Sequence, residues 1–222
     1  RIQRRAGLVH QDDLRADRDR ARDAQALLLT AGEPDPGGVQ AVLDLVPQPG
    51  AAQGGLDDLV EVACRRADSD VWVANFNAPG QIVIGGRREA VVRALDYAKA
   101  RGAVKVIPLS VSGAFHSSLM RPAADGMVQP VATAAITDPV VPVIANCTAT
   151  PVHHEIEIRN ELVDQVCKPV QWSRTVEYLG NQGVETFIEF GPGRVLTAII
   201  KRMLRKSNCI NVNDATSVRL SL

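Results

Sequence analysis

The histidine at position 116 stands where an enzyme often carries a general base. A run rich in β-branched residues at 104–109 precedes it and favours a strand, which Gly113 then breaks. His116 is therefore predicted to lie on a loop at the end of a strand, where proton-transfer groups are common. Position alone nevertheless favours the plainer interpretation, a partly buried histidine with satisfied hydrogen bonds.

Other segments with chemical potential are better explained as structure. The Gly191-Pro-Gly193 segment precedes a predicted helix, whose N-terminus could bind an anion, but the sequence has no P-loop and no dinucleotide fingerprint. A tight strand-to-helix turn is the favoured interpretation. The pair His153-His154 has no carboxylate or thiol at ligand spacing and is expected at the surface. Four cations end the last predicted helix, where they suit the helix dipole or, alternatively, form a basic patch for an acidic partner: Lys201, Arg202, Arg205 and Lys206.

The residues that could act as nucleophiles lack the settings that nucleophiles need. Ser112 and Ser117 are close to His116 in sequence, but no G-x-S-x-G elbow occurs in the chain. The four cysteines are widely spaced, without a C-x-x-C motif or zinc spacing. Reduced thiols in a cytoplasmic protein are the expected state.

Composition limits the classes of partner. The 222 residues include 25 basic and 25 acidic side chains, and this balance gives no indication of a nucleic-acid partner. No apolar run approaches the roughly 20 residues of a membrane span, so no membrane partner is expected. The basic start has no apolar stretch after it and does not resemble a signal peptide. Because the first residue is Arg rather than Met, we expect the chain to be a piece of a longer protein.

Residues 39–110 are predicted to alternate in the order β-α-β-β-α-β, which is typical of a ferredoxin-like split unit with a four-stranded antiparallel sheet. A charged helix at 11–28 and a Pro/Gly linker at 32–38 precede this unit. Residues 75–80 are interpreted as a turn-rich connection. The predicted strands and helices of the unit are, in order, 39–45, 56–67, 71–74, 81–84, 87–101 and 104–109.

From residue 117 onward, helices and strands alternate in a way that favours an α/β arrangement with a mainly parallel sheet. Pro122 suits a helix start, whereas Pro130 is expected to end or kink that helix. Strands are predicted at 140–145 and 184–190, and helices at 155–166, 171–181 and 194–206. The last helix is expected to bury Leu196, Ile199, Ile200 and Leu204, and the chain after Asn211 has no assignment.

Six segments in fixed order and spacing together resemble one family, the malonyl-CoA:acyl-carrier-protein transacylases. The resemblance covers about residues 6–206, and its segments are 37–43 (GGVQAVL), 74–86 (ANFNAPGQIVIGG), 111–120 (VSGAFHSSLM), 144–149 (IANCTA), 168–172 (KPVQW) and 189–196 (EFGPGRVL). The resemblance implies an α/β fold with a partial α/β-hydrolase-like core at 1–37 and 111–222. It also implies that a ferredoxin-like subdomain is inserted at 38–110.

The resemblance implies an activity and residues for it. Such enzymes transfer malonyl from malonyl-CoA through a serine to the phosphopantetheine thiol of acyl-carrier protein in fatty-acid biosynthesis, without a cofactor or metal. His116 matches the histidine that activates the serine, and Gln165 matches the residue whose backbone carbonyl orients its ring. Arg20 matches the arginine that binds the malonyl carboxylate. Phe115 resembles the bulky residue that accompanies malonyl rather than methylmalonyl units.

The serine of these enzymes lies in a G-H-S-L-G elbow, which we expect upstream of Arg1. The 222 residues alone are therefore expected to be inactive. Two alternatives remain open: an acyltransferase domain of a polyketide synthase, and a non-catalytic module of the same fold that binds acyl-carrier protein.

Overall fold

The structure is a computed structural model that describes residues 38–45, 60–66, 70–101, 103–109 and 113–213. All of these belong to one compact unit, Pro34–Leu222. The helix predicted at 11–28, with Arg20, lies outside the described residues. Among the helices of the described ranges, none combines the length and the apolar character needed to cross a membrane.

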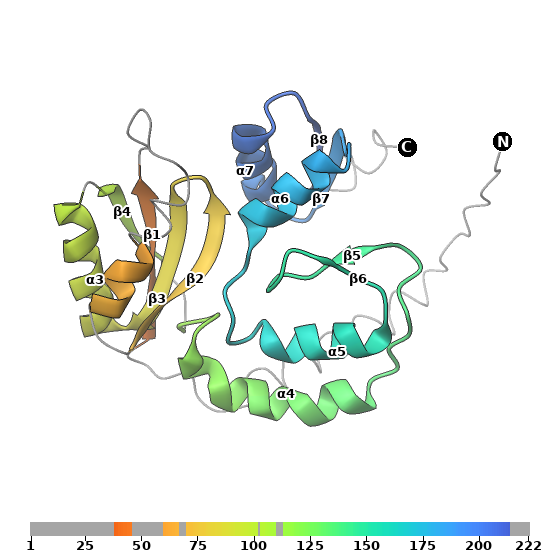
Figure 1. Cartoon of the computed structure of the whole chain (residues 1–222), viewed down its shortest axis with the longest axis horizontal. Coiled ribbons are helices and arrows are strands. Elements are labelled where there is room, and N and C mark those ends of the chain that lie inside the picture. The colour runs from red at the N-terminus through yellow and green to blue at the C-terminus, as the bar shows by residue number, and fades with distance from the viewer. Residues whose placement is uncertain (1–37, 46–59, 67–69, 102, 110–112, 214–222) are drawn as a thin grey trace. The chain divides into compact units, whose positions relative to one another are not determined.

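Four strands form one antiparallel sheet (Figure 1). They are β1 (Gly38–Leu45), β2 (Val71–Ala78), β3 (Gln81–Arg87) and β4 (Ala103–Leu109), in the spatial order β2-β3-β1-β4. β1 pairs with both β3 and β4 in antiparallel register. The predicted four-stranded sheet, with the strands at 39–45 and 104–109 as neighbours, is confirmed.

The β2–β3 hairpin is longer than predicted. β2 continues through Phe76 to Ala78, and the chain reverses in the tight turn at Pro79 and Gly80, where Gly80 has φ 73°. The interpretation of 75–80 as a turn-rich connection was therefore wrong for residues 75–78 and correct for the turn at Pro79 and Gly80. The reason is a partner distant in sequence, because the backbone of this stretch also bonds to Val170 and gains hydrogen bonds that no local pattern reveals.

One face of the sheet is covered by α3 (Arg88–Ala100) and the helical residues 60–66 (Figure 1). The helix buries a stripe of small residues at helical spacing, as a chain with few aromatic side chains requires. Leu43, Ile82 and Ile84 are fully buried beneath it, each contributing about 1.5–3 kcal/mol to folding. The buried core consists of Ala41, Leu43, Val60, Cys64, Val71, Ile82, Ile84, Ala90, Val91, Ala94 and Ala98.

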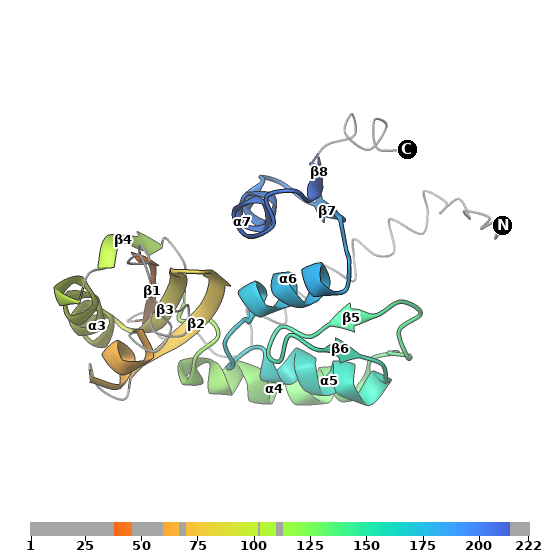
Figure 2. The same cartoon turned by 45° about the horizontal axis from the view of Figure 1, so that its top comes forward.

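Two helices follow the loop that carries His116. A short 3-10 turn, η1 (Ser118–Met120), leads into α4 (Arg121–Thr133), which packs beside α5 (Glu155–Asp164) (Figures 1 and 2). Pro122 lies in the first turn of α4, as predicted, but Pro130 does not end the helix. Pro130 lies in the last turn of α4. Because proline has no N–H, the carbonyl of Gly126 receives no hydrogen bond from position 130, but Gly126 is exposed and water can donate instead.

The strand predicted at 140–145 was mostly wrong. Only β5 (Val143–Ile144) forms, and it pairs antiparallel with β6 (Pro151–Val152). Val140 and Val141 are exposed, with relative accessibilities of 101% and 61%. These two apolar residues therefore do not belong to a buried strand.

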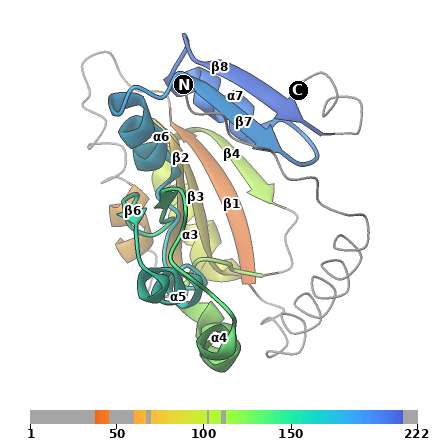
Figure 3. The same cartoon turned by 90° about the vertical axis from the view of Figure 1, so that its right-hand side faces the viewer.

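The last described elements include a parallel strand pair. α6 (Trp172–Asn181) is followed by β7 (Thr186–Phe190), α7 (Val195–Met203) and β8 (Asn208–Val212), and β7 runs parallel to β8 (Figure 3). Ile199 and Ile200 are buried as predicted, but Leu196 is 39% exposed. The predicted mainly parallel sheet is not seen among the described residues after position 117, where β5–β6 is antiparallel and only the β7–β8 pair is parallel.

Candidate functional site

His116 follows β4 on a loop and has a backbone conformation that residues with side chains rarely adopt. Its φ is 60°, in the left-handed region. The backbone N–H of His116 donates a hydrogen bond of 3.1 Å to the carbonyl of Val166. Because such a conformation persists only where surrounding contacts determine it, tertiary structure rather than local preference holds this half-buried residue in place.

The imidazole ring of His116 is oriented by a residue 49 positions away. Its Nδ1 atom lies 2.6 Å from the carbonyl oxygen of Gln165. A carbonyl oxygen can only accept, so in the neutral ring the hydrogen sits on Nδ1 and Nε2 keeps a lone pair. In this tautomer, Nε2 is the atom that can take a proton from a nucleophile. The predicted proximity of His116 to the backbone at Gln165 is confirmed.

Gln165 is itself held by several hydrogen bonds. It is the C-cap of α5, and its backbone N–H donates to the carbonyl of Glu161 at 2.9 Å. Its side-chain Oε1 accepts a hydrogen bond of 2.8 Å from Nδ2 of Asn146. Asn146 in turn accepts one of 2.8 Å from the backbone N–H of Gln171. Asn146 could not be identified from the sequence, because no local pattern predicts a contact between its amide and Gln165.

The same short stretch, residues 165–171, also binds the sheet. The N–H of Val170 donates to the carbonyl of Ala74 at 2.9 Å, and the N–H of Phe76 donates to the carbonyl of Val170 at 2.9 Å. These two bonds make a parallel bridge between Val170 and Asn75 on β2. Residues 165–171 therefore connect the His116 loop to the sheet.

Ser117, next to His116 in sequence, is not placed as its nucleophile. Its side chain is fully buried, and its hydroxyl donates a hydrogen bond of 2.5 Å to the carbonyl of Ala114. The hydroxyl proton that a base would remove is therefore already hydrogen-bonded to a backbone carbonyl. Ser112 lies outside the described residues.

Burial weakens three of the four thiols as nucleophiles at neutral pH. All four cysteines are free. Burial raises the pKa of Cys64 to about 12. Burial, assisted by the negative charge of Glu161, raises the pKa of Cys147 to about 12 as well. Burial also raises the pKa of Cys167. Because the thiolate is the reactive form, Cys64 and Cys147 are nearly unreactive when folded, and the reactivity of Cys167 is lowered.

The helix N-terminus after Gly191-Pro-Gly193 is filled by the chain's own carboxylate. Glu189 accepts hydrogen bonds from the backbone N–H groups of Leu196 at 3.1 Å and Thr197 at 2.9 Å. Hydrogen bonds from Thr197 hold the pKa of Glu189 below its ordinary value. The two glycines have φ of 131° and 89°. The interpretation of this segment as a strand-to-helix turn is confirmed.

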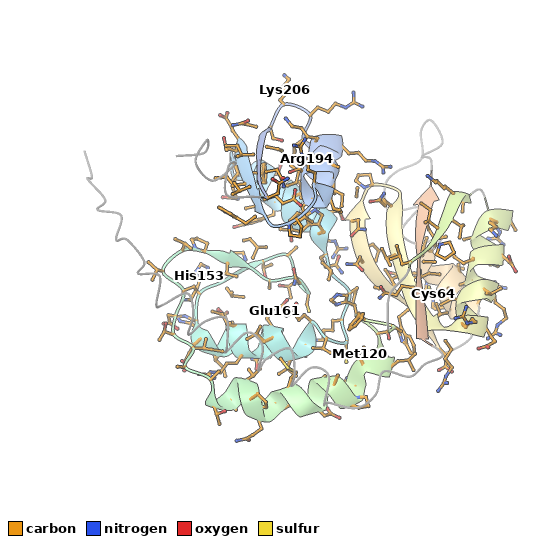
Figure 4. All side chains as sticks on the ribbon, turned by 180° about the vertical axis from the view of Figure 1, so that it is seen from behind. Cys64, Met120, His153, Glu161, Arg194 and Lys206 are labelled. Carbon is orange, nitrogen blue, oxygen red and sulfur yellow. The ribbon has the colours of Figure 1, made fainter. Side chains whose placement is uncertain are left out.

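The pair His153-His154 is exposed, as expected, and Figure 4 shows His153 at the edge of the β5–β6 hairpin. Both residues precede α5, and Oε2 of Glu157 accepts hydrogen bonds from their backbone N–H groups at 2.6 and 2.9 Å. The pair therefore belongs to a helix cap. Within the described ranges, no three His, Cys, Asp or Glu side chains gather as a metal site requires.

The predicted basic cluster divides into two pairs. Lys201 donates to the carbonyl of Ser207, and Arg202 donates to the carbonyl of Pro79 at 3.2 Å. Arg205 and Lys206 are exposed on the loop between α7 and β8, where Figure 4 shows Lys206 pointing outward. All four cations are exposed, and a patch for an acidic partner stays a prediction.

Of the two residues predicted to bind substrate, the structure describes Phe115 but not Arg20. Phe115 is 36% exposed beside His116, and Arg20 lies outside the described residues. Two surface cavities, of about 690 and 640 Å³, are lined by other residues, although Pro169 and Gln171 border the second. The expectation that His116 lies at the edge of a cleft therefore stays a prediction.

Comparison with known proteins gives consistent matches. Residues 40–220 match the acyl transferase domain family. The malonyl CoA-acyl carrier protein transacylase of Escherichia coli (strain K12) is 41% identical over 175 residues, which are 78% of this chain and 57% of that protein. An acyl carrier protein S-malonyltransferase from Vibrio cholerae is similar in structure, with a TM-score of 0.79 and 33% identity over 90% of this chain and 62% of that one.

A third match is the malonyl-transacylase PlMCAT in complex with AntF, a type II PKS acyl-carrier protein. Its TM-score is 0.78 at 36% identity, over 89% of this chain and 61% of that one. The chain thus spans somewhat more than half the length of these relatives. Because the family match extends over most of its residues and the solved relatives share its fold, the chain belongs to the acyl transferase domain family.

Proposed function

We propose that this chain is the histidine-bearing part of a malonyl-CoA:acyl-carrier-protein transacylase of fatty-acid biosynthesis. The observation that carries the proposal is the 2.6 Å contact between Nδ1 of His116 and the carbonyl of Gln165. It fixes the tautomer in which Nε2 can act as a general base. The relatives whose names specify malonyl transfer support the choice of acyl group.

In the proposed reaction, Nε2 of His116 takes the proton of a serine hydroxyl while the serine oxygen attacks the thioester carbonyl of malonyl-CoA. The carbon–sulfur bond breaks, and the coenzyme A thiolate leaves with the proton from His116. In the second half, His116 takes the proton of the phosphopantetheine thiol of acyl-carrier protein, and the thiolate attacks the malonyl-serine ester. The serine leaves and regains its proton.

The serine is proposed to belong to a G-H-S-L-G segment, which the 222 residues do not contain. Two facts support a source outside the described residues: the hydroxyl of Ser117 is committed to the backbone, and the pKa values of Cys64, Cys147 and Cys167 are raised. Arg20 is proposed to bind the malonyl carboxylate, and Phe115 to limit the space beside it.

We also propose that the chain combines an α/β-hydrolase-like core with an inserted ferredoxin-like subdomain. The strand order β2-β3-β1-β4, with all pairs antiparallel, supports a ferredoxin-like subdomain at 38–110. The parallel pair β7–β8 and the strand-to-helix turn after Phe190 support an α/β-hydrolase-like core at 1–37 and 111–222. The four free cysteines are compatible with the proposed cytoplasmic location.

A second candidate is the same chemistry in polyketide biosynthesis. The relative PlMCAT, which is bound to a type II PKS acyl-carrier protein, favours it. The two candidates differ in the carrier protein rather than in the reaction. Transfer to a fatty-acid carrier and to a type II PKS carrier, measured side by side, separates them.

The experiment joins the chain to a segment of the E. coli relative that carries a G-H-S-L-G motif, and follows malonyl transfer from malonyl-CoA to acyl-carrier protein. We expect this joined chain to form a malonyl-enzyme and to pass the group on. His116→Ala should reduce the rate by roughly 10²- to 10⁴-fold, the usual contribution of a general base.

The matched control is His153→Ala, which removes an exposed ring remote from Gln165 and should leave the rate unchanged. A joined chain that folds and binds acyl-carrier protein but never becomes acylated would support the non-catalytic module instead. Equal losses for the two histidine variants would also contradict the proposed role of His116.

A further inference from the structure

We propose that Gln40 is a positioning residue for His116, an inference that rests on the proposed function. Gln40 lies on β1, and its side-chain Nε2 donates a hydrogen bond of 2.7 Å to the carbonyl of Phe115, 75 residues away. Only 7% of Gln40 is exposed. A buried amide is costly unless its hydrogen bonds are made, so this contact fixes where the side chain lies.

The acceptor of this bond belongs to the peptide group that joins Phe115 to His116. The same peptide group donates its N–H, which belongs to His116, to the carbonyl of Val166 at 3.1 Å. Both polar atoms of one peptide plane are thus bonded, its oxygen to Gln40 and its N–H to Val166. A peptide plane held at both atoms cannot rotate, and its orientation fixes the φ of His116.

This restraint matters because His116 has the rare left-handed φ of 60°. Without external hydrogen bonds, a residue with a β-carbon returns to the more populated regions. The ring would then move relative to the carbonyl of Gln165, which is 2.6 Å away in the structure. Gln40 therefore acts on Nε2 indirectly, through the backbone that carries the ring.

The space for Gln40 is provided by a glycine on the neighbouring strand. Gly85 is the residue directly opposite Gln40 in the β1–β3 pair. A Cβ at position 85 would lie 3.0 Å from Cγ and 3.3 Å from Nε2 of Gln40. An alanine there would displace the amide while leaving its chemistry intact, which makes Gly85 an independent means of testing the same contact.

The test uses Gln40→Met, which keeps the length of the side chain and removes the donor. The matched control is Gln129→Met on the exposed surface of α4. Long-range ¹H–¹⁵N NMR spectra of the 222-residue chain, which has four histidines, report the tautomer of each ring. We expect the Nδ1–H tautomer for His116 in the unmodified chain and in Gln129→Met, and a mixture of tautomers in Gln40→Met.

In the joined chain described above, Gln40→Met should lower kcat about ten- to hundredfold with KM changed less than about twofold, because misplacing a base affects the chemical step rather than substrate binding. Gly85→Ala should likewise lower kcat with little change in KM. If Gln40→Met does not fold, Gly85→Ala tests the role of Gln40 in its place. An unchanged His116 tautomer and kcat in a folded variant would overturn the proposal. An inactive joined chain would refute the proposed function, while the NMR result would still decide the role of Gln40.

Discussion

Nδ2 of Asn146 donates a 2.8 Å hydrogen bond to Oε1 of Gln165, the residue whose backbone carbonyl meets the ring of His116. The support for the candidate base therefore extends from α5 to the β5–β6 hairpin region. A carbonyl that orients a catalytic ring must itself be fixed, and Asn146 fixes it through the side chain of the same residue.

Replacing Asn146 by Ala should destabilise the chain by about 1 kcal/mol, because a partly buried amide oxygen loses its donor. Urea denaturation followed by circular dichroism measures the change. Asn160→Ala, on the exposed side of α5, is the control and should have almost no effect. Equal losses in the two variants would show that the bond to Gln165 adds nothing to stability.

Removing the carboxylate at the start of α7, with Glu189→Ala, should cost about 1 kcal/mol, since two backbone N–H groups lose their acceptor. The pH dependence has a definite sign. The folded pKa of Glu189 is lowered, so its contribution is fully present above its ordinary value of 4.5 and is lost as the pH falls through the lower folded value. Thermal unfolding between pH 7 and 3 should show a smaller pH dependence in Glu189→Gln than in the unmodified chain. Identical pH profiles would rule out this role.

Cys64 and Cys147 should resist alkylation at pH 8, because their pKa values are raised to about 12 by burial. Peptide mass spectrometry after iodoacetamide treatment measures the extent of modification at each site. In 8 M urea, where burial is lost, both should react at the rate of glutathione under the same conditions. Rapid reaction in the folded state would mean that these thiols are more accessible than the structure indicates.

Arg20→Ala in the joined chain should reduce malonyl transfer far more than acetyl transfer, because only malonyl offers a free carboxylate. Loss of a charge-assisted pair in a desolvated site costs roughly 2–5 kcal/mol, or about 30- to several-thousand-fold. Initial rates with the two acyl-CoA substrates measure the difference. A similar loss for both would assign Arg20 to structure rather than to substrate binding.

The 222-residue chain by itself should acquire no malonyl group from malonyl-CoA. The hydroxyl of Ser117 donates to a backbone carbonyl, and the sequence contains no G-x-S-x-G elbow. Intact-mass measurement after incubation with malonyl-CoA tests this directly. A stoichiometric adduct that is transferable to a thiol would show that the nucleophile lies within the chain.

The sheet was predictable because its signals are local. The alternation of apolar residues in the strands and the apolar stripe of α3 can both be recognised within a short segment of sequence. β2 was predicted four residues too short because the bond of Phe76 to Val170 is invisible at that range. β8 was not predicted at all, because its Asn-Cys-Ile-Asn-Val sequence becomes a strand only beside β7.

The candidate site was predictable only where a resemblance supplied it. His116 and Gln165 came from segments that are similar to one family, and their contact is present in the structure. Gln40 and Asn146 were not identified, since each acts through a single hydrogen bond to a residue distant in sequence. Periodicity and turn chemistry carry no information about such bonds, which depend on how finished elements pack together.

The hydrogen bonds of residues 165–171 also restrict how many residues this stretch can contain. Val166 is tied to the backbone of His116, and Val170 is tied to the backbone of β2. The three residues between the two valines must therefore span a distance that is fixed at both ends by these hydrogen bonds. An insertion or deletion among these residues would break either the hydrogen bond from His116 to Val166 or the bridge between Val170 and β2.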